Sequence, residues 1–566
     1  MSEPQHEARP PRNNRLDPVS FEVIRNALLN ITEEMAVTIR RAAYSTNIKT
    51  RADFSCAFFD PGFRCVAQSF AQPAHLVSMA SIVPVSIREI GPQNMHAGDA
   101  YLVNDAHRGT SHLNDITVIS PVEIDGVRIG YLANMAHHVD VGGSAPASLG
   151  VSREIFQEGI ILPPTRVASA GAIDPNVLNL ILANIRAPRE TNGDLRAQMS
   201  ANVVGARRLA ALYKRHPGGM LEAFYDELIS YTERWTDSEI RKLPEGVYEA
   251  EGCRDDDGFT DQPVRLKARI TIRDGHVHLD VSGSSEQRPS PMNCTRSMAL
   301  CTVAFVIRCL VDNRVPVNDG FLRRIHLDGP DGLVCTAVRP GAVVGGWELA
   351  ARLAEVVFLA LHPALPDKVP AAGKGLIVNV GFGGVDPRSR EYYCYMETIA
   401  GGNGGRPTKD GPDAVQTNLQ NTENAPIEEV ELNYPIAISR YELIPDSCGA
   451  GRFRGGLGVR REFEFPYAGT TCTILSDGRT FAPWGLAGGQ PAQPARFIYD
   501  PEGEHRVLRS KCTVDIPVGG RIRVETPGGG GFGPFRARDP EAIARDRRDG
   551  KVTDRWVAAA SRADGD

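Results

Sequence analysis

Apolar residues recur at helical spacing from residue 16 to residue 45, close to the beginning of the chain. Among polar positions, one such stripe is typical of an amphipathic helix that packs on a core. Asp17 followed by Pro18 provides an N-cap and a first helical residue, so we expect the helix to begin there. The apolar stripe consists of Phe21, Ile24, Leu28, Ile31 and Met35.

Strand patterns follow this helix. Residues 53–68 are predicted to form two strands around an Asp-Pro-Gly turn, and residues 75–90 begin with a helical pattern. Residues 98–105 predict another strand. Residues 115–138 contain two alternating segments joined by Asp125-Gly126, which predicts an antiparallel hairpin.

The later part of the chain changes period more than once. Residues 179–242 have the helical spacing of about three helices, and residues 264–283 predict a second hairpin with an Asp-Gly turn. Residues 297–311 and 348–365 have the composition of buried helices. Beyond residue 370, strands and glycine-rich turns dominate, and no fixed-period repeat occurs.

These blocks predict an α+β fold with several lobes, in which mixed antiparallel β-rich blocks are separated by helical bundle segments. A chain of 566 residues is too long for one ordinary core. The expected organisation is a disordered leader at 1–15, an N-terminal α+β metal-site region at 16–178, a helical segment at 179–245, a mixed β-rich lobe with buried helices at 246–535, and short C-terminal helices at 536–566.

Composition excludes several classes of protein. A net charge of −6 provides no basic field, so we expect no nucleic-acid partner. The absence of a long apolar run predicts that the chain neither spans a membrane nor carries a secretory signal. The 11 cysteines include no CxxC pair, which is typical of reduced thiols in the cytoplasm.

Histidines and aspartates cluster at the ends of the first predicted hairpin. His112 and Asp115 lie in "GTSHLNDITV", and His137 lies in "MAHHVDVGG". Antiparallel pairing brings the start of one strand beside the end of the next, so these side chains can converge. Imidazole and carboxylate ligands suit one divalent ion, Zn²⁺, Mn²⁺ or Fe²⁺, with Asp53 or Asp105 as a fourth ligand. The alternative is that these groups cap turns.

Other kinds of chemical site lack their signatures. No GxxxxGK[ST] phosphate loop occurs, and the glycine clusters at 401–405, 446–458 and 526–533 fit tight turns better than a phosphate cradle. No GxSxG motif or recognisable cysteine nucleophile is present either. The chain therefore shows no ATP site of its own.

Several long motifs resemble those of the hydantoinase B/oxoprolinase family. They include "STNIKTRADFSCAFFD", "VNDAHRGTSHLNDITVISPV", "AHHVDVGG", "EIFQEGIILPP", "PVNDGF", "DSCGAGRFRGGLG" and "TPGGGGFG". They occur in the family's order, and the resemblance covers residues 16–560. Members are B-type subunits of N-methylhydantoinase, caprolactamase and 5-oxoprolinase, and the same subunit type serves in acetone and acetophenone carboxylases.

The resemblance implies a division of labour within a hetero-oligomer. An A-type ATPase subunit, using ATP with Mg²⁺, would phosphorylate the carbonyl oxygen of a small cyclic amide. The B-type subunit would then carry out the metal-dependent hydrolysis, in which metal-bound water attacks the phosphorylated carbonyl. The chain would thus be an ATP-dependent cyclic amide hydrolase that is active only with its partner. Two alternatives stay open: a subunit of a ketone carboxylase, and a non-catalytic scaffold that has lost the metal.

The resemblance also assigns residues. It implies metal ligation by His112, Asp115 and His137, with a fourth, acidic ligand. Many relatives have a glutamate where this chain has Thr50, which leaves Asp53 as the nearest carboxylate.

Two further residues, His138 and Asp140, are the catalytic candidates, and we expect them to orient the ligands or to move protons. The alternative is that they brace the turn at Gly142-Gly143. Glu154 and Glu158 are weaker candidates for proton transfer, since charged pairs of this kind are commonly solvated.

Overall fold

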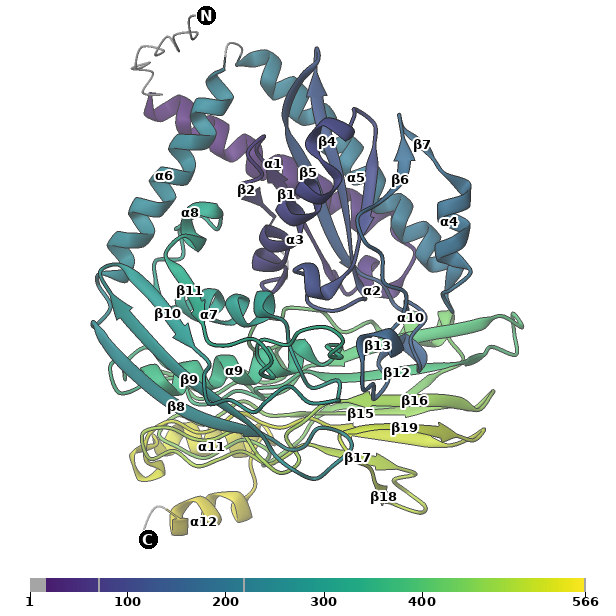
Figure 1. The fold of residues 1–566 in the computed structure, drawn as a ribbon. Helices are drawn as coiled ribbons and strands as arrows, with labels where there is room; N and C mark the ends of the chain where they lie inside the picture. The colour runs from purple at the N-terminus through teal and green to yellow at the C-terminus, as the bar shows by residue number, and fades with distance from the viewer. Residues whose placement is uncertain (1–16, 70–71, 217–218, 564–566) are drawn as a thin grey trace, which may run out of the picture.

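The computed structural model describes residues 17–69, 72–216 and 219–563 (Figure 1). The predicted leader at 1–15 lies outside the described residues. Within them, several mostly antiparallel sheets alternate with helices, so the expected α+β fold is confirmed. In this described part, no helix is both long enough and apolar enough to cross a membrane.

The N-terminal part contains an antiparallel sheet in the order β2-β1-β5-β4-β3-β6-β7. Along β1 the side chains alternate between the two faces of this sheet, as the pleat requires. Phe54, Cys56 and Phe58 pack in the core with α1 and α5, whereas Ala57 and Phe59 pack in the core with α3. The strands are β1 (Phe54–Phe59), β2 (Cys65–Gln68), β3 (Ala100–Val103), β4 (Asp115–Ile124), β5 (Val127–His137), β6 (Thr165–Ser169) and β7 (Ala172–Ile173).

The helices that cover this sheet follow the predicted patterns. The side chain of Asp17 accepts hydrogen bonds from the backbone N–H groups of Val19 and Ser20, so the expected cap of α1 is confirmed. The helical pattern that begins at residue 75 continues through Pro84 as one helix. The helices are α1 (Pro18–Ala42), α2 (Thr46–Lys49), α3 (His75–Ile90), α4 (Pro175–Leu182), α5 (Pro188–Arg215) and α6 (Met220–Ile240).

A second sheet follows α6, in the order β11-β10-β9-β8, with α7 and α9 packed against it (Figure 1). Along β9 every second residue, from Val264 to Ile272, is buried in the core shared with these two helices. The elements are β8 (Gly246–Arg254), β9 (Val264–Arg273), β10 (His276–Asp280), α7 (Arg296–Leu310), α8 (Asp319–Leu322), β11 (Ile325–Asp328) and α9 (Gly346–Leu361).

Two further sheets share a core in the C-terminal part (Figure 1). Their strand orders are β13-β12-β16-β19 and β14-β15-β20-β17-β18. The elements are β12 (Val378–Val385), β13 (Tyr392–Ile399), α10 (Ile427–Asn433), β14 (Ala437–Leu443), β15 (Val459–Glu464), β16 (Thr470–Leu475), β17 (Arg496–Tyr499), β18 (Arg506–Val507), β19 (Lys511–Ile516), β20 (Arg521–Glu525), α11 (Pro540–Arg548) and α12 (Asp554–Ala563).

The hairpin β4–β5 positions the predicted site. Asp125 and Gly126 at its turn have φ angles of 51° and 80°, as a tight hairpin turn with two left-handed residues requires. The resulting register pairs Asp115, the first residue of β4, with His137, the last residue of β5. The hairpin and its turn are therefore as the sequence predicts.

Candidate metal centre

Three predicted ligands meet at one end of the N-terminal sheet. His112, Asp115 and His137 are buried, and one ligand atom from each lies within 4.8 Å of the others. The imidazole centroids of His112 and His137 are 4.9 Å apart, and His112 Nε2 lies 3.5 Å from Asp115 Oδ2. Distances of this order allow one cation to contact all three side chains.

Asp53 joins this cluster because it directly precedes β1, the neighbour of β5. Its carbonyl oxygen accepts a hydrogen bond from the backbone N–H of His137 (3.0 Å). Its side chain lines the same small cavity as His112 and His137. The pairing of β1 with β5 thus brings the predicted fourth carboxylate to the centre.

His75, the first residue of α3, is a member of the cluster that sequence reasoning missed. Its Nε2 atom lies 3.7 Å from Asp115 Oδ1, and its ring is fully buried. A lone histidine at the start of a helix has no spacing that relates it to the hairpin. Only the packing of α3 against the sheet brings it there.

Five polar atoms in this cluster are buried and have no hydrogen-bond partner in the described part of the chain. Leaving a buried polar atom without a partner costs about 1–3 kcal/mol, so several in one place need an explanation. A cation between His112, Asp115 and His137, whose ligand atoms lie within 4.8 Å of one another, would satisfy the atoms of these three residues. Asp53 and His75 lie beside that position. The atoms are Asp53 Oδ1, His75 Nε2, His112 Nε2, Asp115 Oδ1 and His137 Nε2.

The other nitrogen of each ring contacts a fixed polar group. His112 Nδ1 lies 3.4 Å from the carbonyl oxygen of Val344, and His75 Nδ1 lies 3.1 Å from the hydroxyl of Ser55. His137 Nδ1 lies 3.3 Å from the side-chain amide of Asn47. Such contacts fix the orientation of metal-ligating imidazoles, and here they leave every Nε2 atom for the centre.

The charges at the centre favour a cation. Burial lowers the pKa of His112, but the Asp115 carboxylate outweighs it and raises this pKa to about 9. Burial raises the pKa of Asp115, yet His112 and His75 hold it well below its usual range. Burial also raises the pKa of Asp53 and lowers that of His137. Asp115 is therefore ionised beside a protonated His112. A divalent ion that binds here would take the place of the proton on His112.

The residue that departs from the family pattern does not join the cluster. The Thr50 hydroxyl donates to the carboxylate of Glu429 on α10, with both oxygens at 2.7 Å. Asp105, the other carboxylate considered from sequence, pairs with Arg108 and Arg339 (2.6 Å to the latter). Asp53 is consequently the second carboxylate that reaches the centre.

The two catalytic candidates contact other parts of the structure. His138 Nε2 lies 3.0 Å from the side-chain oxygen of Gln198 on α5, so its ring is turned away from that of His137. The Asp140 carboxylate accepts from the guanidinium of Arg186 (2.9 Å) and from the backbone N–H of Gly142 (2.9 Å). These contacts match the turn-bracing alternative for Asp140.

Glu158 supports the wall of the centre from a distance. Its buried carboxylate accepts from the backbone N–H groups of Val343 (2.9 Å) and Val344 (2.8 Å) and from Ser152 (2.8 Å). Val344 in turn presents its carbonyl oxygen to His112. Glu154 instead lies exposed in a bridge with Gly341. Neither glutamate lines the cavity at the centre.

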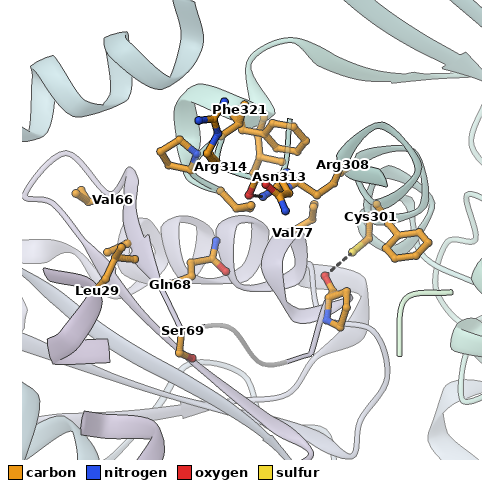
Figure 2. A pocket seen from close by; sticks show the side chains of 18 of the residues that line it. Leu29, Val66, Gln68, Ser69, Val77, Cys301, Arg308, Asn313, Arg314 and Phe321 are labelled. Atoms are coloured by element: carbon orange, nitrogen blue, oxygen red, sulfur yellow. Dashed lines mark hydrogen bonds between the residues drawn. The ribbon is translucent and has the colours of Figure 1, made fainter. Parts of the chain in front are cut away.

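The cavity beside the cluster has a volume of about 10 Å³, which suits one ion or one water molecule. Its other walls come from the second half of the chain: Trp347, Ile377, Asn379, Met396, Thr398 and Gln420. A much larger, mostly apolar cavity of about 650 Å³ lies between β2 and α7 (Figure 2). Pro73 and Val77, which flank His75 in the chain, line that larger cavity.

Comparison with known proteins places these features in a family. The model of the family described as hydantoinase B/oxoprolinase matches residues 17–535. The B-type component of a putative D-/L-hydantoinase from Pseudomonas sp. (strain NS671) is 32% identical over 559 residues, which cover 95% of this chain and 94% of that protein. The beta component of caprolactamase from Pseudomonas jessenii is 30% identical over 555 residues, which cover 95% of both chains.

Solved structures have the same fold. A crystal structure of ATP-dependent caprolactamase from Pseudomonas jessenii aligns with a TM-score of 0.89 and 28% identity, and covers 95% of both chains. A nucleotide-free acetone carboxylase structure aligns with a TM-score of 0.88 and 18% identity, over 96% of this chain and 79% of that chain. At that identity the second similarity concerns the fold alone.

Proposed function

The chain belongs to the hydantoinase B/oxoprolinase family, and from this premise we propose that it is the metal-dependent, hydrolytic subunit of an ATP-dependent cyclic amide hydrolase. The two relatives, from a hydantoinase and a caprolactamase, are matched along nearly their whole length. Hydantoins and lactams are both cyclic amides, so a cyclic amide is the substrate class that these two relatives share.

The observation that carries the proposal is the cluster of five buried polar atoms without a hydrogen-bond partner among the described residues. Three of them, on Asp53, His112 and His137, belong to residues that line one small cavity. Three imidazole nitrogens and two carboxylate oxygens are ligands that Zn²⁺, Mn²⁺ and Fe²⁺ accept. Asp53, His112, Asp115 and His137 would hold the ion, with His75 beside Asp115. When bound, such an ion supplies Lewis acidity, which lowers the pKa of a coordinated water to about 7 and polarises a substrate oxygen.

The rest of the chain keeps these ligands in place. Arg51 NH1 donates to Asn47 Oδ1 (2.7 Å), and the Asn47 amide contacts His137. Ser111 donates to one oxygen of Asp115, which leaves the other oxygen for the centre. Trp347 stacks on His112 with centroids 6.1 Å apart and shields it from solvent. The ligands are therefore held in place before substrate binds, as a catalytic centre requires.

A partner is part of this proposal. The sequence contains no phosphate loop, and the two relatives are named as B-type or beta components of their enzymes. We therefore assign ATP with Mg²⁺, and the phosphorylation of the amide oxygen, to an A-type subunit. Phosphorylation removes amide resonance. On this chain water would then add to the activated carbon, and the ring C–N bond would break as the nitrogen takes up a proton. Hydrolysis of the resulting acyl phosphate by a second water would release the carboxylate and phosphate.

The test combines metal analysis with reconstitution. Purified chain is expected to bind about one divalent ion, and the chain mixed with its A-type partner is expected to open a cyclic amide ring with consumption of ATP. His112→Ala should lose the ion and the ring-opening activity, because it removes one ligand and leaves Asp115 without its counter-charge. His505→Ala, at an exposed position, is the matched control.

Other outcomes would contradict the proposal. Retention of the metal and of ring opening by His112→Ala would remove the ligand assignment. A wild-type chain that binds no divalent ion would be a scaffold instead. ATP turnover that requires bicarbonate and a ketone, without ring opening of any amide, would identify a carboxylase subunit.

A further inference from the structure

We propose that Trp347 and Gln420 recognise the edge of the cyclic amide that carries its C=O and N–H groups, and so determine that the substrate of this centre is an amide. The inference rests on the proposed function and extends it to substrate selection. Both side chains line the cavity at the metal centre, although they come from the second half of the chain. Each of them presents a buried polar atom for which the described residues provide no hydrogen-bond partner.

Trp347 provides a donor. Its side chain is held between two members of the centre: the His112 ring stacks on it at 6.1 Å, and the His75 ring meets it edge-on at 5.6 Å. The residue is 5% exposed, and its Nε1–H has no acceptor in the described part of the protein. A buried indole N–H usually has a partner, so this one is available to a ligand.

Gln420 provides an acceptor. Its Nε2 donates to the Thr422 hydroxyl (3.4 Å), which also accepts a hydrogen bond from Gln72 (2.6 Å). These contacts orient the Gln420 amide, and its Oε1 is left buried without a donor among the described residues. The residue is 8% exposed, so bulk water does not solvate this oxygen.

One donor and one acceptor in the same cavity match the chemistry of a ring amide. A small ring forces its amide to be cis, so that the C=O and N–H groups lie along one edge of the ring. The indole N–H can donate to the oxygen while Gln420 accepts the N–H. A ketone or a lactone has no N–H, so its binding would leave the Gln420 oxygen buried and unpaired, which selects strongly against it.

The same pair suits the phosphorylated ring. Its C=N nitrogen has a lone pair and can accept from the indole N–H of Trp347. Addition of water across the C=N bond puts oxygen on carbon and a proton on nitrogen. Gln420 then accepts a hydrogen bond from the new N–H. Because this contact forms only as the reaction proceeds, it stabilises the transition state more than the bound substrate and so increases the rate.

The wall that carries Gln420 is also where room for a ring can arise. Gln420 lines the small cavity, and the next residue, Asn421, lines the apolar cavity of about 650 Å³. The two preceding residues, Asn418 and Leu419, have φ angles of 38° and 59°. This left-handed backbone costs about 1–2 kcal/mol at Leu419, whereas asparagine adopts it readily, so the strain of the segment lies at Leu419. A displacement of residues 418–420 would join the small cavity at the metal centre to the larger apolar cavity.

The test measures binding to the metal-loaded full chain by calorimetry. The probes are 2-pyrrolidinone, ε-caprolactam and hydantoin, followed by the N-methyl analogue of whichever binds tightest. Wild type is expected to bind the N–H form about 10- to 100-fold more tightly than the N-methyl form. Gln420→Met should bind the N–H form as weakly as wild type binds the N-methyl form, and should lose the preference. Trp347→Phe should weaken both ligands and keep the preference.

A second readout uses the complex with its ATPase partner. Gln420→Met and Trp347→Phe should consume more ATP per ring opened, because phosphorylation continues while hydrolysis is slowed. Gln490→Met and Trp556→Phe are the matched controls, since neither residue lines the cavity. Metal content and thermal stability are measured for every variant, so that a loss of bound metal or of folding is distinguished from a loss of substrate recognition.

The results separate the two proposals. A complex that opens no cyclic amide ring would contradict the proposed function itself. A complex that opens the ring while Gln420→Met retains both the preference for N–H and the wild-type ratio of ATP to product would overturn this inference alone. Loss of metal in Gln420→Met or Trp347→Phe would also overturn it, because the residue would then support the centre and not the substrate.

Discussion

Single residues decide which atoms remain for the metal centre. The Nδ1 atoms of His75, His112 and His137 each contact a polar group, so that the three Nε2 atoms converge without partners among the described residues. Each of these contacts comes from a different segment: Ser55 in β1, Val344 before α9, and Asn47 in α2. The centre is thus specified by its supporting contacts as much as by the ligands.

His75 provides a test at this scale. We expect His75→Ala to weaken metal binding by roughly 10- to 100-fold, as is usual when a ligand or its supporting group is removed. Ser55→Ala should act in the same direction but less strongly, because it only frees the ring of His75. Titration with a competing chelator measures both, with His362→Ala as control. Wild-type affinity in His75→Ala would exclude His75 from the centre.

The hairpin β4–β5 is the element on which the centre depends, because its register places Asp115 opposite His137. Gly130 in β5 has a φ of 150°, and a Cβ atom there would lie 2.3 Å from the carbonyl oxygen of Phe59. A Cβ atom on Gly126, at the turn, would meet no atom within 4 Å. The close packing of β5 against β1 therefore requires glycine at position 130 because there is no space for a side chain. At position 126 glycine is favoured only by the backbone angle of the turn.

These two glycines form a matched pair. Gly130→Ala is expected to lower the free energy of unfolding by about 2–3 kcal/mol, since backbone atoms must move to admit the methyl group. Gly126→Ala should cost about 1 kcal/mol or less, the usual difference at a positive φ without a clash. Chemical denaturation followed by circular dichroism measures both. Equal effects would contradict this account of the β1–β5 contact.

Helix α9 (Gly346–Leu361) is a buried helix that carries charged residues along one side. Its residues are almost all buried, yet Glu348, Arg352 and Glu355 recur at helical spacing along one side. Glu348 accepts from Asn379 (2.7 Å), a wall residue of the centre, and Arg352 donates to the carbonyl oxygen of Phe481 (2.7 Å). The apolar side packs against β8 and β9. The helix thus connects the middle sheet to the C-terminal sheets and carries Trp347 to the centre.

The whole molecule completes the centre from two distant parts of the chain. The ligands lie before residue 140, whereas Trp347, Asn379, Met396, Thr398 and Gln420 form the opposite walls. Arg51 joins the two parts. It is fully buried and donates to the Met396 carbonyl oxygen (2.7 Å) and to the Thr398 hydroxyl (3.0 Å).

Replacement of this arginine tests the connection between the parts. Arg51→Met retains most of the volume but leaves buried acceptors without donors, so we expect a loss of about 3 kcal/mol in stability and weaker metal binding through Asn47. Arg40→Met removes a half-exposed contact with Glu423 and an exposed hydrogen bond to the carbonyl oxygen of Lys49, and should change stability by less than about 1 kcal/mol. Thermal denaturation and chelator titration measure the two effects. If Arg51→Met kept wild-type stability and metal affinity, the metal centre would not depend on the contacts that Arg51 makes between the two parts of the chain.

The sequence by itself determined the parts of this protein that depend on near neighbours. The stripe and cap of α1, the Asp-Gly turn of β4–β5, and the approach of His112 and Asp115 to His137 follow from period and turn chemistry within a few tens of residues. The long motifs identified the family for the same reason, since they are contiguous.

Only the tertiary structure decided the remainder of the centre. His75, Trp347 and Gln420 reach it because α3, α9 and the segment before α10 pack together, and no local pattern encodes that packing. The contacts of Asp140 with Arg186 and of Thr50 with Glu429 also join separate elements, across 46 and 379 positions of the sequence. Local geometry fixes which side chains share a strand or a helix face, whereas burial of apolar faces fixes which elements meet, and the centre required both.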